Sequence, residues 1–389
     1  MEKRIIVFLT ALIISLSLFV PVCSAVDVSA QSAVLMCVNN AKVLFSRNAD
    51  MKLSMASTTK IMTSLIALEA ATPEREITVT KEMVSVEGTS MGLMPDDSVS
   101  LKELVYGMLL QSGNDAANTV AYAIGGSPEG FAELMNKRSD EIGMKNTSFV
   151  TASGLDDEDH YSTAYDMALL ASECIKNPEF VSICSQKTAR LTYGNPPYSR
   201  MLTNHNKLLW MHSDVIGIKT GFTKKSGRCL VSAAKRGGVT LVAVTLNAPD
   251  DWNDHLSMIE YGFSQCKGVK INCDLSNVML NVAGGVKKQI PVELSSNPEW
   301  IDGEQCFVKF LIKPMVYAPV QKGDIVGTAV FINQSGDVIS ETPLMACEDV
   351  EFKKSEEPDK QENEGLFSGI IQKIKDLFKG NFRGEIIGR

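Results

Sequence analysis

The sequence has little of what nucleic-acid-binding and zinc-dependent proteins need. Its 38 basic residues are outnumbered by 46 acidic ones, for a net charge of −8, whereas nucleic-acid binding requires a basic face that neutralises phosphates. None of its nine cysteines belongs to a C-x-x-C pair, and its histidines are too scattered for a zinc site. We therefore expect no nucleic-acid partner, no metal site and no cofactor. We interpret the histidines as polar or structural: His160, His205, His212 and His255.

The first residues have the layout of a secretory signal peptide. Two basic residues precede an almost unbroken apolar run from Ile5 to Val20, and small residues follow up to Ala25. This order predicts cleavage after Ala25 and export of the mature protein. A retained transmembrane anchor is the alternative, because roughly 17 apolar residues can just span a bilayer.

Eight cysteines remain once Cys23 leaves with the signal peptide. An exported protein could pair some of them. A chain with a large core does not require disulfides, so buried free thiols are the preferred interpretation, with any pairing left open. The eight are Cys37, Cys174, Cys184, Cys229, Cys266, Cys273, Cys306 and Cys347.

The hydrophobic pattern predicts a mixed α/β (α+β) domain followed by a small all-β domain. The length of 389 residues favours two domains. A strand hairpin is expected at 34–45, helices at 57–71, 101–110, 115 onward, 128–143 and 163–174, and strands at 215–222, 229–234 and 239–246. Strands on both sides of a helical stretch favour a mixed sheet with a helical subdomain. We predict a signal peptide at 1–25, a first domain at 26–267, a β-rich domain at 268–350, a charged linker at 351–365 and a tail at 366–389.

The tail has the pattern of an amphipathic helix. Such a helix can lie in a membrane interface, so we expect peripheral association with a membrane surface. A frayed helix or a partner-docking segment is the alternative. The apolar positions that share one face are Phe367, Ile370, Ile371, Ile374, Leu377 and Phe378.

Ser57-Thr58-Thr59-Lys60 begins the first helical run and carries a candidate nucleophile. A serine hydroxyl needs an adjacent base, and a desolvated lysine can be that base. Residues three apart on a helix share a face, and a helix N-terminus favours a developing alkoxide. The pair is weak evidence alone, because Ser264 and Lys267 have the same spacing.

Two further short motifs follow. Ser112-Gly113-Asn114 lies on a turn between helices, where a hydroxyl and an amide can point into one cleft. Lys219-Thr220-Gly221 lies in a strand-like run, where Gly221 lets a substrate backbone approach the strand edge. Either motif alone could be a surface turn or an edge strand.

In this order the three motifs form the signature set of penicillin-binding proteins and serine β-lactamases. The sequence around them resembles the D-alanyl-D-alanine carboxypeptidases, the low-molecular-mass penicillin-binding proteins of serine peptidase family S11. The resemblance covers roughly 33–263 and extends more loosely into the β-rich region. Its segments are 55–63, 111–117, 135–136, 143–147, 160–164 and 214–223.

The resemblance implies a fold and an activity. The first domain would have the β-lactamase/transpeptidase-like fold. The enzyme would be a serine-type carboxypeptidase that removes the terminal D-alanine from a peptidoglycan stem pentapeptide ending in D-Ala-D-Ala. β-Lactams such as penicillin would be covalent inhibitors. The location would be extracytoplasmic, either secreted or peripheral on the outer face of the cytoplasmic membrane.

The resemblance also implies residue roles. Ser57 would attack the substrate carbonyl, Lys60 would accept its proton, and Ser112 would relay protons. Asn114 would hold the substrate amide, while Lys219 and Thr220, next to Gly221, would bind the terminal carboxylate. The backbone N–H groups of Ser57 and Phe222 would form the oxyanion hole.

Two positions depart from the family pattern. Some relatives carry an arginine between the two asparagines of Asn204-His205-Asn206, where this chain has His205. Some carry an arginine in the segment that here reads Asp250-Asp251-Trp252-Asn253-Asp254. Carboxylate binding is therefore expected to depend more on Lys219 and Thr220.

Three other kinds of protein were weighed against this interpretation. A class A β-lactamase needs a glutamate that positions the deacylating water, and the acids at 156–159 lack that arrangement. A zinc carboxypeptidase needs a ligand cluster. A non-catalytic penicillin-binding scaffold would not need Ser57, Lys60 and Lys219, which are all present.

Overall fold

The computed structural model describes residues 26–334, 336–354, 369 and 371–373. The predicted signal peptide at 1–25 and nearly all of the predicted linker and tail lie outside the described residues. The described chain forms two compact units, of which the first contains the residues up to Ile271 together with 298–307 and 333–339. The predicted domain limits stay predictions. Within the described ranges, no helix has both the length and the apolar character to cross a bilayer.

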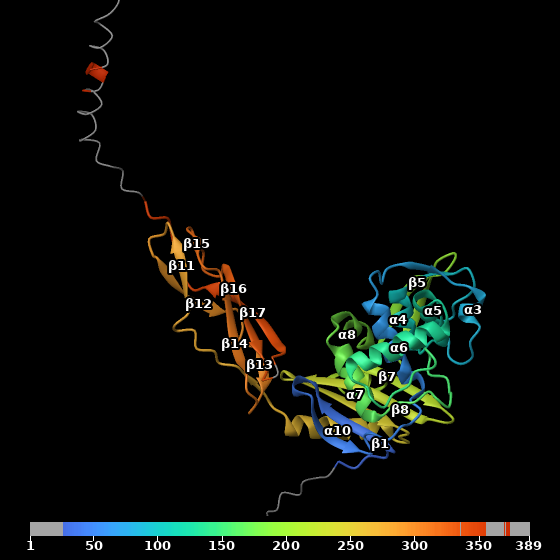
Figure 1. The fold of residues 1–389 in the computed structure, drawn as a ribbon. Helices are drawn as coiled ribbons and strands as arrows, with labels where there is room; N and C mark the ends of the chain where they lie inside the picture. The colour runs from blue at the N-terminus through green and yellow to red at the C-terminus, as the bar shows by residue number, and fades with distance from the viewer. Residues whose placement is uncertain (1–25, 335, 355–368, 370, 374–389) are drawn as a thin grey trace, which may run out of the picture. The chain divides into compact units, whose positions relative to one another are not determined.

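The first unit is built on a five-stranded sheet with the strand order β2-β1-β9-β8-β7 (Figure 1). All neighbouring strands in it are antiparallel, so this sheet is antiparallel rather than mixed as predicted, while the helical subdomain is present. The predicted hairpin near the N-terminus and the three later strands are confirmed. The strands are β1 (Ser32–Cys37), β2 (Lys42–Arg47), β7 (Val215–Thr223), β8 (Gly227–Arg236) and β9 (Val239–Leu246).

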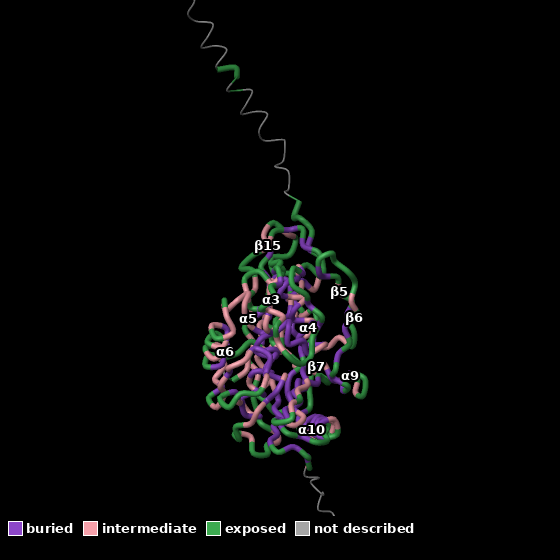
Figure 2. The backbone as a smooth tube through the Cα atoms, turned by 90° about the vertical axis from the view of Figure 1, so that its right-hand side faces the viewer, coloured by how far each residue is buried: buried purple, intermediate pink, exposed green. Residues whose placement is uncertain are grey.

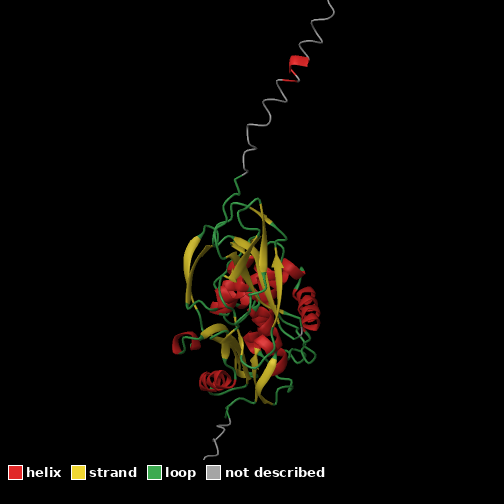
Figure 3. Ribbon diagram, turned by 90° about the vertical axis from the view of Figure 1, so that its left-hand side faces the viewer, coloured by secondary structure: helices red, strands yellow, loops and turns green. Residues whose placement is uncertain are grey.

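Helices cover both faces of this sheet (Figure 3). Successive side chains of a strand point to opposite faces, so Leu35 packs toward α10 (Asp251–Gln265) while Val34 and Met36 pack toward the other helices. All residues of β1 and β9 are buried for this reason. The helices of the opposite layer include α2 (Lys60–Glu69), α7 (Ala164–Ile175) and α8 (Pro178–Cys184).

Three helices of the helical part begin with a side-chain cap. Ser100 precedes α4 (Leu101–Gln111) and forms a capping box with Glu103. Ser127 caps α6 (Pro128–Ile142), which has proline in its first turn, and Thr163 caps α7. Between them lies α5 (Asn114–Gly125). Figure 2 shows buried residues concentrated in the interior around α4 and β7, with exposed residues along β5 and β6.

The helix predicted at 57–71 is wrong at both ends. Residues Ala56–Thr59 form a 3₁₀ turn, α2 begins at Lys60, and the chain is extended at Ala70. The turn is tightened because the hydroxyls of Thr58 and Thr59 donate to the carbonyls of Met55 and Ala56, at 2.6 and 2.8 Å. Residues i and i+3 eclipse in a 3₁₀ helix, so Ser57 and Lys60 still share a face.

Shorter elements complete the first unit. They are β3 (Glu76–Thr78), α3 (Lys81–Val84), β4 (Ser98–Ser100), β5 (Thr188–Tyr193), β6 (Tyr198–Thr203), α9 (Leu208–Met211), β10 (Gly268–Lys270) and β13 (Glu299–Ile301).

The second unit is a six-stranded sheet with the order β14-β16-β17-β12-β11-β15. Its strands alternate buried and exposed residues, as in β12, which is the pattern of a sheet with one covered face. The predicted β-rich region is confirmed. The strands are β11 (Met279–Ala283), β12 (Gln289–Leu294), β14 (Phe307–Ile312), β15 (Val316–Tyr317), β16 (Ile325–Ile332) and β17 (Val338–Ala346).

Candidate active site

Ser57 and Lys60 lie together at the start of α2. Lys60 is fully buried, and its Nζ lies 3.0 Å from Ser57 Oγ, 2.7 Å from Asn114 Oδ1 and 2.6 Å from the carbonyl oxygen of Ser153. Ser57 is half-buried and borders an open pocket. The structure therefore places a solvent-accessible hydroxyl next to a buried amine.

The environment of Lys60 favours the neutral amine. Burial lowers its pKa well below the ordinary value, the charge of Lys219 lowers it further, and Asp115 opposes this. A neutral amine has two N–H donors and one lone pair. Asn114 Oδ1 and the Ser153 carbonyl can take the two donors, which leaves the lone pair for the Ser57 hydroxyl. This is the geometry of a nucleophile with its general base.

Ser112 and Asn114 occupy the connection between α4 and α5. Ser112 caps α4 with a φ of 61°, a left-handed conformation that is uncommon for residues other than glycine. It lines the same pocket as Ser57. Both polar atoms of the Asn114 side chain are bonded, since Oδ1 accepts from Lys60 and Nδ2 donates to the Glu87 carbonyl at 2.6 Å. Asn114 thus contacts the lysine, and its predicted contact with the substrate amide stays a prediction.

Lys219, Thr220 and Gly221 lie on β7 as predicted, but their accessibility differs. Thr220 and Gly221 line the pocket. Lys219 is 1% exposed, and its Nζ donates to the Thr220 carbonyl at 2.7 Å. Burial lowers the pKa of Lys219 to about 7. The structure thus brings Thr220 to the pocket surface and buries the Lys219 amine against the Thr220 carbonyl.

Gly221 allows β7 to approach the turn that carries Ser57. A Cβ on Gly221 would lie 3.0 Å from the Met55 oxygen and 3.1 Å from the Ser57 and Thr58 nitrogens. Such contacts are tighter than backbone atoms normally accept. The Ser57 and Phe222 amides, predicted to form an oxyanion hole, flank this contact.

We expect Gly221→Ala to slow acylation by a penicillin about ten- to hundredfold, because a sub-ångström shift misaligns both amides. The measurement is the acylation rate constant with a fluorescent penicillin. Gly126→Ala is the control, because Gly126 has a φ of 73° with no atom near its Cβ position. That variant should lose stability without a comparable change in rate. An unchanged rate in Gly221→Ala would contradict the proposed role of the close approach.

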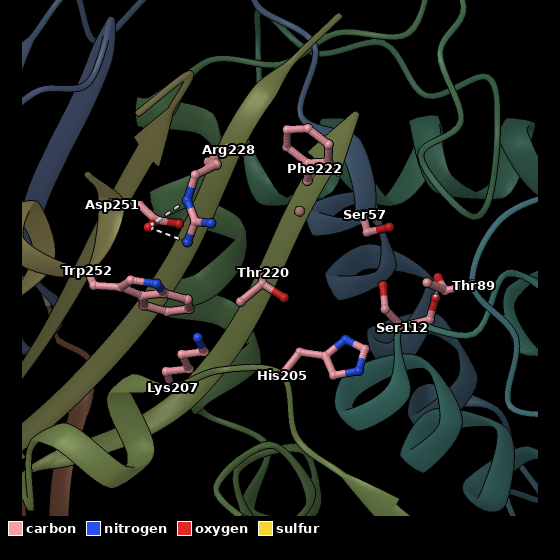
Figure 4. Close-up of a pocket in the computed structure, with 11 residues that line it drawn as sticks. Ser57, Thr89, Ser112, His205, Lys207, Thr220, Phe222, Arg228, Asp251 and Trp252 are labelled. Carbon is pink, nitrogen blue, oxygen red and sulfur yellow. Dashed lines mark hydrogen bonds and ion pairs between the residues drawn. The ribbon is translucent and has the colours of Figure 1, made fainter. Parts of the chain in front are cut away.

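The pocket beside Ser57 has a volume of about 370 Å³. In Figure 4, Ser57 and Ser112 approach it from the helical side, Arg228 and Trp252 line the opposite side, and Thr220 lies between them. Its lining residues are Ser57, Thr89, Ser112, His205, Lys207, Thr220, Gly221, Phe222, Arg228, Asp251 and Trp252. The pocket is thus an open groove along β7 with hydroxyls on one side and charged groups on the other.

Sequence reasoning missed several residues of this site. Ser153 contributes only a backbone carbonyl, which no side-chain pattern reveals. The glycine that follows it, Gly154, indicates that this loop lies close to the Ser57 turn. Its φ is 83°, and a Cβ there would lie 1.9 Å from the Ala56 oxygen. Arg228 was missed because the predicted strand began at residue 229, whereas β8 begins at Gly227 and pairs Arg228 with Phe222.

The four histidines have different surroundings. His160 and His255 are buried and hydrogen-bonded, and His160 Nε2 lies 2.8 Å from Thr59 Oγ1 beneath the Ser57 turn. His212 pairs with Glu260 at 2.9 Å. His205, however, lines the pocket, and its ring points toward Ser112 in Figure 4. Burial and then the charge of Lys219 lower its pKa, so His205 is a neutral pocket residue.

The structure also shows the state of the cysteines and of the side chains that could bind a metal ion. Cys37, Cys174, Cys184, Cys229 and Cys266 are buried free thiols. Across the described ranges, no group of three or more His, Cys, Asp or Glu side chains is arranged to hold a metal ion.

Comparison with known proteins identifies the family of this chain. A family model of D-alanyl-D-alanine carboxypeptidases matches residues 20–250. The chain belongs to the D-alanyl-D-alanine carboxypeptidase family. The carboxypeptidase DacF of Bacillus subtilis is 34% identical over 82% of this chain and 86% of its own length. DacC of Escherichia coli is 35% identical over 84% of this chain and 86% of its own length.

A solved structure agrees with the same family. Penicillin-binding protein 5 of Haemophilus influenzae is 27% identical, with a TM-score of 0.59 over 84% of this chain and 99% of its own. The predicted fold class is confirmed, as is the predicted enzyme class, a serine-type D-alanyl-D-alanine carboxypeptidase. Membership in this carboxypeptidase family also decides against the alternatives of a class A β-lactamase, a zinc carboxypeptidase and a non-catalytic scaffold.

Proposed function

We propose that the enzyme removes the terminal D-alanine from peptidoglycan stem pentapeptides through an acyl-enzyme on Ser57. The observation that carries the proposal is the 3.0 Å contact between Ser57 Oγ and the buried Lys60 Nζ at the edge of an open pocket. Penicillin acylates the same serine in this proposal, since its strained amide presents a carbonyl to the same nucleophile.

The first half-reaction breaks the peptide bond. Ser57 Oγ attacks the carbonyl carbon of the penultimate D-alanine while its proton moves to the neutral Lys60 amine. The C–N bond then breaks, and the departing nitrogen receives that proton from Lys60, with the Ser112 hydroxyl as relay. The products are an ester on Ser57 and free D-alanine. The depressed pKa of Lys60 suits both proton transfers.

The second half-reaction restores the serine. Water attacks the ester carbonyl, gives a proton to Lys60, and the Ser57 oxygen leaves with a proton in return. In both halves the developing oxyanion is stabilised by the backbone N–H groups of Ser57 and Phe222. Removing one such donor typically costs on the order of 10²–10³ in rate.

The proposal includes export, because stem peptides lie outside the cytoplasmic membrane. The predicted signal peptide and the predicted membrane-associating tail support it from the sequence. A location outside the cytoplasm also agrees with the cell-wall substrate of this carboxypeptidase family.

The test uses the whole mature protein with two substrates. We expect release of D-alanine from a pentapeptide ending in D-Ala-D-Ala, and a long-lived covalent adduct with a fluorescent penicillin. Mass mapping of the adduct should identify the peptide that contains Ser57. Rapid turnover of penicillin without D-alanine release would contradict the proposal and indicate a β-lactamase.

A further inference from the structure

Arg228 lies beside Thr220 on the open side of the pocket. It pairs with Phe222 across β7 and β8, so its side chain emerges on the same face as Phe222 and Thr220. Thr220 is its diagonal neighbour, and such neighbours lie within reach of long side chains. Figure 4 shows the guanidinium of Arg228 on the side of the pocket opposite Ser57.

Two neighbours fix the orientation of this guanidinium. Nε and Nη2 of Arg228 both donate to Asp251 Oδ1, at 2.9 and 2.6 Å. The Arg228 guanidinium also lies 5.3 Å from the centre of the Trp252 ring, a distance at which a cation–π interaction operates. The Asp251 side chain is 3% exposed, whereas that of Arg228 is 41% exposed. Asp251 and Trp252 therefore hold the arginine while leaving much of it open to the pocket.

The remaining donors of Arg228 are available to a ligand. Its Nη1 makes no hydrogen bond to any described residue, and a guanidinium has five N–H donors in a planar fork. Among the described groups that line the pocket, Arg228 and Lys207 are cationic and Asp251 is anionic. The pocket thus has an excess of positive charge, which favours an anionic group near Thr220.

Lys219 is poorly placed to supply that charge at the surface. It does not line the pocket, and its Nζ donates to the carbonyl of Thr220. Burial and then the charge of Lys219 lower the pKa of His205, which disfavours its charged form. A substrate carboxylate that reaches the Thr220 hydroxyl therefore shares the pocket with Arg228, a cation that Asp251 and Trp252 orient.

We propose that Arg228, together with the Thr220 hydroxyl, binds the C-terminal carboxylate of the peptide and makes the enzyme selective for a free carboxyl terminus. Asp251 and Trp252 are positioning residues that act through Arg228. This inference rests on the proposed function, because it assigns one end of the proposed substrate. It also accounts for a chain that has His205 between its two asparagines and no arginine in the stretch 250–254, the two places where some relatives carry arginine.

The experiment compares two peptides that differ only in their last group. One ends in D-Ala-D-Ala with a free carboxylate, and the other ends in the C-terminal amide. We expect Arg228→Gln to lower kcat/KM for the free acid about ten- to hundredfold, the effect of losing a hydrogen bond to a charged group. The value for the amide should change little, so the acid-to-amide ratio falls. The loss should appear mainly as a higher KM for the acid, because Arg228 contacts the carboxylate in the bound substrate as well as in the transition state.

Arg236→Gln is the matched control. Arg236 lies on the same strand, pairs with Asp214 and Glu260, and lies 4.2 Å from the Phe263 ring, but it does not line the pocket. It should keep the wild-type ratio. If Arg228→Gln is unstable, Arg228→Lys, which keeps the charge but not the planar fork, should lower the ratio by about tenfold.

The outcomes separate this inference from the function on which it rests. An unchanged acid-to-amide ratio in the Arg228 variants, or an equal loss for both peptides, overturns the role of Arg228. Failure of the wild-type enzyme to release D-alanine from the free acid overturns the proposed function instead.

Discussion

Replacement of Ser57 by alanine is expected to abolish covalent labelling by penicillin and to lower D-alanine release by a factor on the order of 10⁶, the scale seen when a serine hydrolase loses its nucleophile. The reason is that the variant lacks the hydroxyl that lies 3.0 Å from Lys60 Nζ and that forms the ester in the proposed reaction. The measurements are the labelled fraction by mass spectrometry and kcat for a D-Ala-D-Ala pentapeptide. Because Ser57 donates no structural hydrogen bond that other groups need, the variant should fold normally.

The chain itself offers a matched control for that experiment. Ser264 and Lys267 have the same sequence spacing as Ser57 and Lys60, but both are exposed and α10 ends at Gln265. Ser264 donates to the Tyr261 carbonyl at 2.6 Å. Ser264→Ala should therefore behave as wild type. Labelling that persists in Ser57→Ala would overturn the assignment of the nucleophile.

The second large effect is expected when the general base, Lys60, is replaced. Lys60→Met is expected to lower the acylation rate constant by about 10²–10⁴, the usual contribution of a general base. Methionine fills a similar volume without an amine. It leaves the acceptors Asn114 Oδ1 and the Ser153 carbonyl without their donor, so thermal unfolding must be recorded beside the rate. Lys267→Met is the control, because that lysine is exposed.

The pH dependence gives a second readout of the same prediction. Lys60 acts as a base only when neutral, and its pKa is depressed by burial. The wild-type acylation rate should therefore rise with pH as the Lys60 ammonium loses its proton, and reach a plateau at a pH well below the ordinary pKa of lysine. The residual rate of Lys60→Met should lack this rise. A variant that keeps both the rate and the wild-type pH profile would contradict the role of Lys60.

Lys60→Arg separates charge from basicity. A guanidinium keeps a positive charge and several donors but cannot be deprotonated in a protein. We expect this variant to be as slow as Lys60→Met. Recovery of activity by arginine would mean that Lys60 acts as a fixed charge near Ser57.

Much of the fold was readable from local patterns. The helices predicted at 128–143 and 163–174, the hairpin at 34–45 and the strands at 215–246 follow from hydrophobic period and turn residues. They are confirmed because neighbouring residues determine them. The start of α2 was misjudged, because hydroxyl-to-carbonyl bonds of Thr58 and Thr59 favour a 3₁₀ turn that hydrophobic spacing does not reveal.

The candidate site divides in the same way. The sequence alone determined the reaction class, since the motifs of Ser57, Ser112 and Lys219 occur in a set order and carry the chemistry in their side chains. Only the tertiary structure decided which groups reach the pocket surface. It buried Lys219 against the Thr220 carbonyl, engaged both polar atoms of Asn114, and made Arg228 a diagonal neighbour of Thr220 through the register of two strands. Accessibility and partners are set by contacts between residues far apart in the chain, which no local pattern contains.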